Sequence, residues 1–178
     1  RLAQGRVIEV LGDYYSPGIE TKIAVRDYSL PYKWSQEIIE SVQNLTSKIS
    51  QDNSRVDLRL KHFITIDGSD ARDFDDAVYC ESFENEQFKL WVAIADVAEY
   101  VSQASSTDRE ALKRGNSVYF PNHVIPMLPE RLSNDLCSLN PNEEKLVVVC
   151  EMTINIDGII ENFNFYEATI VSHARKTY

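Results

Sequence analysis

The chain has 178 residues, of which 43% are hydrophobic and 26% charged, and its formal net charge is −10. This composition is typical of a globular protein with a sizeable core, and the acidic excess argues against a surface that binds polyanions through clustered lysine and arginine alone. The longest wholly apolar runs, residues 91–95 and 146–150, are far shorter than the roughly 20 residues of a membrane span, so we expect no membrane partner.

The first third of the chain combines short β-type runs with a helical segment. Residues 3–11 (AQGRVIEVL) and 20–28 (ETKIAVRDY) flank the turn-rich GDYYSPG, and we expect two strands from the end of a β-barrel module. Apolar residues at helical spacing predict a helix within residues 34–49. The polar stretch 50–57 follows and is expected to be a linker.

Short apolar runs joined by turns follow from residue 63. FITI (63–66) leads into an acidic loop, AVYC (77–80) leaves it, and FKLWVAIA (88–95) can pair with AVYC across SFENEQ. This order predicts a strand, an acidic loop and a β-hairpin.

The rest of the chain predicts a helix, a long loop and a second hairpin. STDREALKRG has a possible capping box at Thr107 and Glu110 and a glycine at its end, which predicts a two-turn helix. Residues 119–144 hold four prolines and are expected to form a long, functional or poorly assigned loop. Two apolar runs then flank Asp157 and Gly158, a strong hairpin signal. The predicted fold class is α+β, with mostly antiparallel strands and a helical linker.

Five aspartates within ten residues are the most informative feature of the chain. They are Asp67, Asp70, Asp73, Asp75 and Asp76, and Arg72 is the single cation between them. Carboxylates this close repel one another unless a bound cation or protonation neutralises them. Mg²⁺ prefers oxygen ligands, and a pair of such ions about 3.5 to 4 Å apart can activate a water and stabilise the leaving oxygen of a phosphodiester.

Four of these aspartates stand at the two ends of the loop. Asp67 ends one predicted strand, and Asp73, Asp75 and Asp76 begin the next after an excursion of five residues, so both ends can face one site. On a regular strand the adjacent Asp75 and Asp76 would point to opposite faces. A bulge at the loop exit is therefore needed if both bind metal.

Two other acidic loops fit these residues poorly. An EF-hand calcium loop begins to match at Asp73 and Asp75, but Ala77 and Val78 stand where a ligand and a glycine belong. The phosphatase loop D-x-D-G-T is similar to TIDGS, but Thr65 occupies the position of its nucleophilic aspartate. A solvated acidic loop without function remains open, although Phe74 and the flanking strands would fix the loop in place.

Several motifs in the correct order resemble the catalytic domain of the ribonuclease II and ribonuclease R family, the RNB family. They are TIDGSDARDFDDAVYCE, LWVAIADVAEYV, RGNSVYFPNHVIPMLPERLSNDLCSLNP and SHARKTY, and the first looks most like the bacterial ribonuclease R form. GRVIEVLGD and IAVRDYSLPYKW resemble the end of the cold-shock (oligonucleotide-binding, or OB) domain that precedes it. The resemblance implies the C-terminal part of a cold-shock or OB-type domain at 1–33, a helical linker at 34–58 and the N-terminal half of an RNB catalytic domain at 59–178.

The resemblance implies a hydrolytic 3′-5′ exoribonuclease that degrades single-stranded RNA to nucleoside 5′-monophosphates with one or two Mg²⁺ ions. It implies Asp67 and Asp76 as direct metal ligands, with Asp73 and Asp75 completing the metal site and acting in catalysis. Asp75 is the residue whose loss is expected to stop cleavage most cleanly. Asp70 lies outside the set of four.

Two tyrosines match aromatic residues that contact RNA in the family. Tyr119, in SVYF, falls where an aromatic stacks on a base near the 3′ end, and Tyr178 matches another aromatic beside the RNA channel. Stacking on an aromatic face contributes roughly 1 to 3 kcal/mol per base without sequence preference. Without the resemblance, Tyr119 would be read as a core tyrosine on a short strand.

The family also uses an arginine, a glutamate and a second stacking aromatic that would lie beyond residue 178. We therefore expect this piece alone to be inactive or nearly so, and to self-associate through apolar surface on a truncated face. One alternative is a non-catalytic RNA- or metal-binding module of the same fold. A DNA exonuclease is another, since two metals can cut either backbone.

Three widely spaced cysteines without a CxxC pair or signal peptide indicate reduced thiols and a cytoplasmic location.

Overall fold

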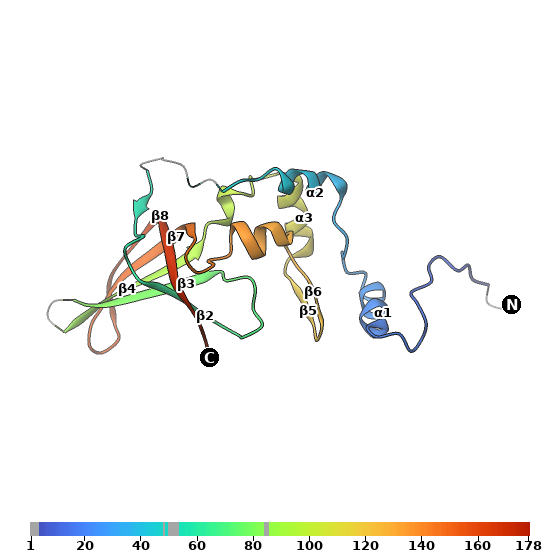
Figure 1. Cartoon of the computed structure of the whole chain (residues 1–178), viewed down its shortest axis with the longest axis horizontal. Helices are drawn as coiled ribbons and strands as arrows, with labels where there is room; N and C mark the ends of the chain where they lie inside the picture. The colour runs from blue at the N-terminus through green and yellow to red at the C-terminus, as the bar shows by residue number, and fades with distance from the viewer. Residues whose placement is uncertain (1–3, 48, 50–53, 84–85) are drawn as a thin grey trace.

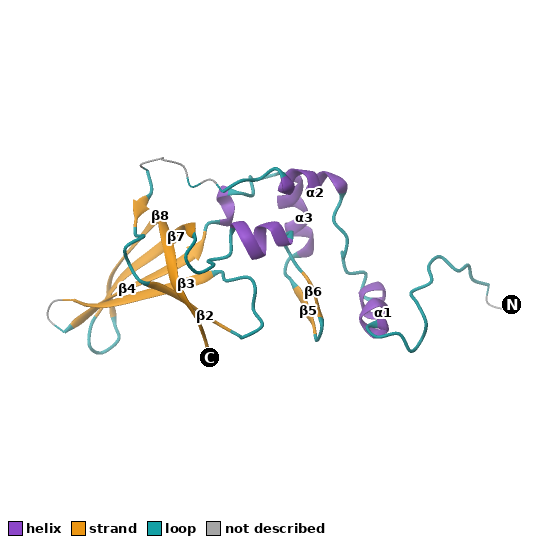
Figure 2. Ribbon diagram, in the orientation of Figure 1, coloured by secondary structure: helices purple, strands orange, loops and turns teal. Residues whose placement is uncertain are grey.

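The computed structural model describes residues 4–47, 49, 54–83 and 86–178 (Figure 1). Figure 2 shows the large sheet at one end, helices α2 (Gln36–Gln43) and α3 (Ser106–Arg114) in the middle, and α1 (Ile19–Asp27) towards the N-terminus. The first residue of the expected 3–11 strand, the first half of the expected 50–57 linker and part of the SFENEQ turn lie outside the described residues. Within the described ranges, no helix is long and apolar enough to cross a bilayer.

The main sheet has six strands, and their pairing closes on itself. The strands are β1 (Val56–Asp57), β2 (Phe63–Asp67), β3 (Asp76–Phe83), β4 (Gln87–Ala95), β7 (Glu144–Ile154) and β8 (Ile160–Thr177). Their order is β1-β8-β2-β3-β4-β7, and β7 also pairs with β8. Strands β2, β3, β4, β7 and β8 therefore form a ring of hydrogen-bonded neighbours, as in a small barrel. The two pairs that join β8 to β1 and β2 are parallel and the others are antiparallel, which confirms the mostly antiparallel prediction.

Strand β8 closes this ring because it is long enough to have two neighbours in succession. Its first part pairs with β7 up to Val171, and its last part pairs with β2 from Ser172 to Thr177. The C-terminal end of the chain consequently lies beside β2, the strand that leads into the acidic loop (Figure 1).

The inner face of the ring is the core. Ala77 lies opposite Ala93, which lies opposite Val149, and these three side chains are at most 1% exposed. Trp91 is 3% exposed, and its indole Nε1 donates a hydrogen bond of 3.2 Å to the hydroxyl of Tyr166. Small residues in one row leave room for the large ring in the next, so the interior is filled by side chains.

The outer face of the ring is also apolar, but it is partly open to solvent. One register row runs through Val78, Val92, Cys150 and Phe165. Phe163 and Phe165 are 61% and 63% exposed, and their ring centroids lie 5.8 Å apart. We call Ile94, Val148, Phe163 and Phe165 the outer apolar face. Exposed apolar surface of this kind was expected from the resemblance to half of a domain.

The segment predicted as one long loop contains regular structure. Strands β5 (Val118–Phe120) and β6 (His123–Ile125) form a hairpin, and a π-helical turn, η2, spans Arg131–Leu136. Residues 119–144 were expected to be a functional or poorly assigned loop, and these elements show that the loop assignment was poor. Prolines hid the elements, because β5 ends directly before Pro121, and β6 and η2 each lie between two prolines, a spacing that resembles a series of turns.

The helix after β4 forms as predicted, but its cap differs. A 3-10 turn, η1 (Val97–Glu99), comes first, and α3 then begins after Ser105. The Ser105 hydroxyl accepts from the Asp108 amide at 3.1 Å, and the Asp108 carboxylate accepts from the Ala104 amide at 2.7 Å. The expected box at Thr107 and Glu110 was two residues too late, because Thr107 lies inside the helix and is buried.

The N-terminal prediction was wrong in its secondary structure. Residues 20–28 largely form helix α1, and residues 4–11 form no strand. Residues 19–27 have no neighbouring strand among the described residues. A strand here would leave its backbone N–H and C=O groups without partners, whereas a helix forms these hydrogen bonds within itself. Arg26 of α1 also forms a salt bridge of 2.7 Å with Glu9. The predicted helix over 34–49 is shorter than expected, since α2 ends at Gln43.

Candidate metal centre

The acidic loop joins the end of β2 to the start of β3. Asp67 is the last residue of β2 and Asp76 the first of β3, and the two strands pair antiparallel through Ile64 and Val78. Asp75 lies just before β3, where its carbonyl accepts a hydrogen bond of 2.9 Å from the amide of Ala95. Asp75 is adjacent to Asp76, and the negative charge of Asp76 acts on the Asp75 carboxyl and helps to raise its pKa.

Four carboxylates act on one another at this place. We call Asp67, Asp73, Asp75 and Asp76 the aspartate cluster. Desolvation raises the pKa of the Asp67 carboxyl, repulsion by Asp76 and Asp73 adds to this, and Arg175 opposes it. The pKa of Asp75 is also raised, first by desolvation and then by Asp73, Asp76 and Asp67, although the residue keeps an exposed surface. The structure therefore brings together the four aspartates singled out from the sequence, and Asp70 is not among the groups that raise the pKa of Asp67 or Asp75.

The cluster fits a hard divalent cation in charge and in donor type. The Oδ2 atom of Asp67 is buried without a hydrogen-bond partner, and buried acceptors normally have one. Across the described ranges, no set of three or more His, Cys, Asp or Glu side chains is already arranged around a common ion position. Mg²⁺ commonly keeps several waters and uses one or two carboxylates together with substrate phosphate, so a preformed protein cage is not required.

The acidic loop is held by residues far away in the sequence. The amide of Phe74 donates to the Ser138 hydroxyl at 3.0 Å, and this hydroxyl donates to the carbonyl of Arg72 at 3.2 Å. The amide of Leu139 donates to the carbonyl of Phe74 at 2.8 Å, and Phe74 itself is buried. These contacts fix the backbone between Asp73 and Asp75, so the loop is not simply a solvated turn.

A second support comes from Arg175 near the end of β8. Its guanidinium donates to the carbonyls of Gly68 and Ser69 at 2.9 and 2.8 Å, and it lies 4.8 Å from the ring centroid of Phe74. Neither Ser138 nor Arg175 was among the predicted site residues. For Arg175 the available signal was the SHAR motif, and for Ser138 no sequence pattern indicated a contact with the acidic loop.

The two predicted RNA-binding tyrosines have different surroundings. Tyr119 lies on β5, is 66% exposed, and its hydroxyl is 3.5 Å from Oδ2 of Asp73. It is therefore not a core tyrosine. Tyr178 is 96% exposed and follows Thr177, the register partner of Asp67. The structure thus brings Tyr119 to the cluster and places only the backbone of Tyr178 close to β2.

A cavity of about 270 Å³ lies beside the cluster. Asp73 and Asp75 line it together with apolar residues and Cys137. Burial raises the pKa of the Cys137 thiol to about 12, so this thiol is protonated near neutral pH and is not a ready nucleophile. The cavity combines carboxylates with apolar walls, the usual composition of a site for a small organic group.

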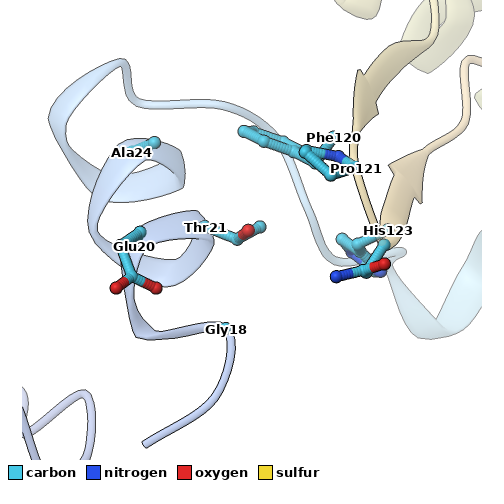
Figure 3. A pocket seen from close by; sticks show the side chains of 8 residues that line it. Gly18, Glu20, Thr21, Ala24, Phe120, Pro121 and His123 are labelled. Atoms are coloured by element: carbon cyan, nitrogen blue, oxygen red, sulfur yellow. The ribbon is translucent and has the colours of Figure 1, made fainter. Parts of the chain in front are cut away.

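A larger hollow of about 450 Å³ separates α1 from the β5–β6 hairpin. Figure 3 shows Thr21 of α1 on one side and Phe120 and His123 of the hairpin on the other. Phe120 pairs with His123, whereas the neighbouring Tyr119 pairs with Val124, so the two pairs lie on opposite faces of the hairpin. This hollow therefore lies behind the hairpin, away from the face that carries Tyr119.

Two protein-family profiles match the chain. The RNB domain matches residues 55–178, and a cold shock domain matches residues 1–35. Ribonuclease R of Vibrio cholerae is 52% identical over 176 residues, which is 98% of this chain and 21% of that relative. The chain thus spans about a fifth of the length of this curated relative.

Solved structures of a further relative have the same fold. Mycoplasma genitalium RNase R in complex with ribose methylated single-stranded RNA matches with a TM-score of 0.90 and 38% identity, over 96% of this chain and 27% of that one. The same protein in complex with double-stranded RNA matches with a TM-score of 0.91 and 39% identity, over 96% and 30%.

Proposed function

This chain belongs to the RNB family, and from that premise we propose that it carries the metal-binding half of a hydrolytic 3′-5′ exoribonuclease. The proposed reaction is Mg²⁺-dependent hydrolysis of single-stranded RNA to nucleoside 5′-monophosphates. The observation that carries the proposal is the aspartate cluster, in which four carboxylates repel one another and one buried oxygen of Asp67 has no hydrogen-bond partner.

Each member of the cluster has a proposed role. Asp67 and Asp76 would hold one or two Mg²⁺ ions directly, and Asp73 and Asp75 would complete the site and act in catalysis. A bound Mg²⁺ would supply a nucleophilic water at neutral pH and stabilise negative charge on the phosphodiester. The contacts of Ser138 and Arg175 with the acidic loop support this assignment, because a metal centre needs its ligands held by neighbouring groups.

The proposed RNA contacts are stacking contacts. Tyr119 and Tyr178 would each present an aromatic face to a base, which grips RNA without reading its sequence. The exposure of both rings supports this role, as does the position of the Tyr119 hydroxyl near Asp73. An RNA strand on Tyr119 would then have its phosphates beside the cluster.

We propose the three-part layout stated above: an OB-type segment at 1–33, a linker at 34–58 and half of a catalytic domain at 59–178. The cold shock profile over residues 1–35 and the RNB profile over residues 55–178 support this layout. We also propose a cytoplasmic location, supported by three cysteines that form no disulfide.

We further propose that the 178-residue chain self-associates when isolated. The support is the outer apolar face, whose two phenylalanines are each more than half exposed. Large contiguous apolar patches are uncommon on monomeric soluble proteins.

The activity is tested with a 5′-labelled oligoadenylate and the protein at its full natural length. We expect shortening from the 3′ end that requires Mg²⁺, and loss of at least a hundredfold in rate for Asp75→Asn. Asp70→Asn is the matched control and should cleave at close to the wild-type rate. The isolated 178-residue chain should be inactive or nearly so. Mg²⁺-independent cleavage, or full activity of Asp75→Asn, would contradict the proposal.

A non-catalytic RNA- or metal-binding module is the second candidate. It is favoured by the finding that the described carboxylates are not already set in a group of three or more around one position. In the same assay such a module would retain labelled RNA on a filter, release no shortened product with any of Mg²⁺, Mn²⁺ or Ca²⁺, and bind equally well in a chelator. A matched DNA oligonucleotide tests the third alternative, since a DNA exonuclease would shorten DNA at least as fast as RNA.

A further inference from the structure

We propose that Arg175 is a positioning residue of the metal centre, which sets the spacing between Asp67 and the other members of the aspartate cluster. The inference deepens the proposed function and rests on it for the identity of the ion. Its grounds are the register of β8 against β2 and the contacts that Arg175 makes with both ends of the acidic loop.

The register places Arg175 on the same side of the sheet as Asp67. In the parallel β2–β8 pair, Thr65 lies opposite Arg175 and Asp67 lies opposite Thr177. Side chains alternate along a strand, so Thr65, Asp67 and Arg175 share one face, whereas Lys176 points to the other. Asp67 also experiences the positive charge of Arg175, which acts against the repulsion from the other carboxylates.

One guanidinium contacts both ends of the loop. At the start, it donates to the carbonyls of Gly68 and Ser69, the two residues directly after Asp67. At the end, it lies over the ring of Phe74, which stands between Asp73 and Asp75. The carbonyl of Gly68 also accepts from the amide of Ala71 at 3.1 Å, so this turn is fixed from two directions. A single side chain thus links the backbone beside Asp67 to the backbone that carries the other ligands.

The hydrogen bonds of Arg175 leave the carboxylates available. Its Nη2 atom donates to two backbone carbonyls, and Oδ2 of Asp67 is buried without a hydrogen-bond partner. A direct salt bridge would instead occupy a ligand oxygen. Arg175 therefore supplies positive charge and a fixed loop while Asp67 keeps an oxygen for an ion.

Lysine cannot reproduce this arrangement. Both hydrogen bonds come from Nη2, and an ammonium could also donate twice. A guanidinium, however, can at the same time place its planar group over the ring of Phe74, whereas an ammonium is a point charge on a flexible stem. Arg175→Lys keeps the positive charge but loses the planar group. Arg175→Met loses both the charge and the hydrogen-bond donors and keeps an unbranched apolar side chain. Lys176→Met is the matched control, because it removes one positive charge from the adjacent position on the opposite face.

The test measures Mn²⁺ binding by paramagnetic resonance, and the Mg²⁺ concentration for half-maximal cleavage, on the protein at its full natural length. We expect Arg175→Met to weaken Mn²⁺ binding and raise the Mg²⁺ midpoint at least tenfold, with the affinity for RNA in chelator changed less than twofold. Arg175→Lys should fall between wild type and Arg175→Met. Lys176→Met should stay within twofold of wild type.

Three outcomes would overturn the inference. They are an unchanged Mn²⁺ affinity in Arg175→Met, equal effects of Arg175→Met and Lys176→Met, and wild-type behaviour of Arg175→Lys, which would reduce the role to charge alone. If Arg175→Met fails to fold, the comparison of Arg175→Lys with Lys176→Met still tests the inference, because only Arg175→Lys should weaken Mn²⁺ binding more than twofold. If wild type binds Mn²⁺ but cleaves no RNA, the proposed function fails, and the binding data still test Arg175.

Discussion

Asp67 and Asp70 are three residues apart, yet they have different surroundings. Asp67 ends a strand, and its Oδ2 atom is buried without a partner. Asp70 is exposed on the loop, where a Cβ on Gly68 would approach its Oδ1 atom to 3.1 Å. The presence of an aspartate in the acidic loop is therefore not enough to make it a metal ligand. The position of the residue relative to the strand ends decides whether its carboxylate oxygens lie near those of the other aspartates.

The first prediction concerns the repulsion within the cluster. Without metal, Asp75→Asn should raise the melting temperature at pH 7 by roughly 2 to 4 °C, which corresponds to about 1 kcal/mol after solvent screening in a chain of this size. The raised pKa of Asp75 means that its carboxylate destabilises the fold above that pKa, and the penalty disappears as the pH falls and the group is protonated.

Calorimetry in chelator measures this effect, with Asp70→Asn as the control. Mg²⁺ should raise the melting temperature of wild type and have less effect on Asp75→Asn. A lower melting temperature for Asp75→Asn in chelator would mean that the carboxylate stabilises the metal-free fold.

The second prediction concerns the cysteines. Burial raises the pKa of Cys137 to about 12, while Cys80 is exposed. Iodoacetamide reacts with thiolates, so at pH 8 Cys80 should be alkylated at least tenfold faster than Cys137 in the folded chain. Raising the pH to 9 should leave Cys137 slow, because its thiol remains protonated until near pH 12. Mass spectrometry of peptides measures both rates, and equal rates in denaturant are the control.

At the scale of elements, local patterns predicted the strands around the cluster and missed elements that depend on distant partners. Strands β2, β3 and β4 lie where short apolar runs predicted them, and the Asp157-Gly158 turn joins β7 to β8 as expected. Helix α1 is rich in β-branched residues and was predicted as strand, but it has no strand partner. Ser138 and Arg175 contact residues of the acidic loop that are 64 to 107 positions away in the chain. A local sequence pattern cannot predict contacts over such separations.

The third prediction tests the observed cap of α3. Ser105→Ala should lower the free energy of unfolding by about 1 kcal/mol, because it removes the acceptor for the Asp108 amide. Thr107→Ser is a test of the alternative box at Thr107, and it should change stability less, since Thr107 lies inside the helix. Chemical denaturation monitored by circular dichroism measures both. A larger loss of unfolding free energy in Thr107→Ser than in Ser105→Ala would contradict the observed cap and support a cap at Thr107.

At the scale of the whole molecule, the ring of strands separates two apolar faces with different environments. The inner face is closed, and the outer apolar face is open, with Ile94 47% and Val148 37% exposed. A sheet with two apolar faces is normally covered on both sides. The outer apolar face is therefore the surface to which we assign the proposed self-association.

The fourth prediction concerns that surface. Replacing Phe163 and Phe165 together by threonine, which keeps a strand-forming side chain, should shift sedimentation of the 178-residue chain from associated species towards monomer. Asn162 and Asn164 alternate with them along β8, so threonine at both of these positions is the matched control and should leave the distribution unchanged. Monomeric wild type at 100 µM, roughly the range where weak association is measurable, would contradict the proposed self-association.

The closure of the ring by β8 has a consequence for the order of folding. The β2–β8 pair joins residues 63–67 to residues 172–177, so this junction cannot form before nearly all of the chain described here has been synthesised. The β3–β4 and β7–β8 hairpins are local and can form early, whereas pairing across such a separation is slow because of the loop that it closes. Asp67 and Arg175 meet at this last junction. A nascent chain would therefore hold its carboxylates in a loop that lacks the contacts of Arg175, and the metal centre would be completed only with the fold.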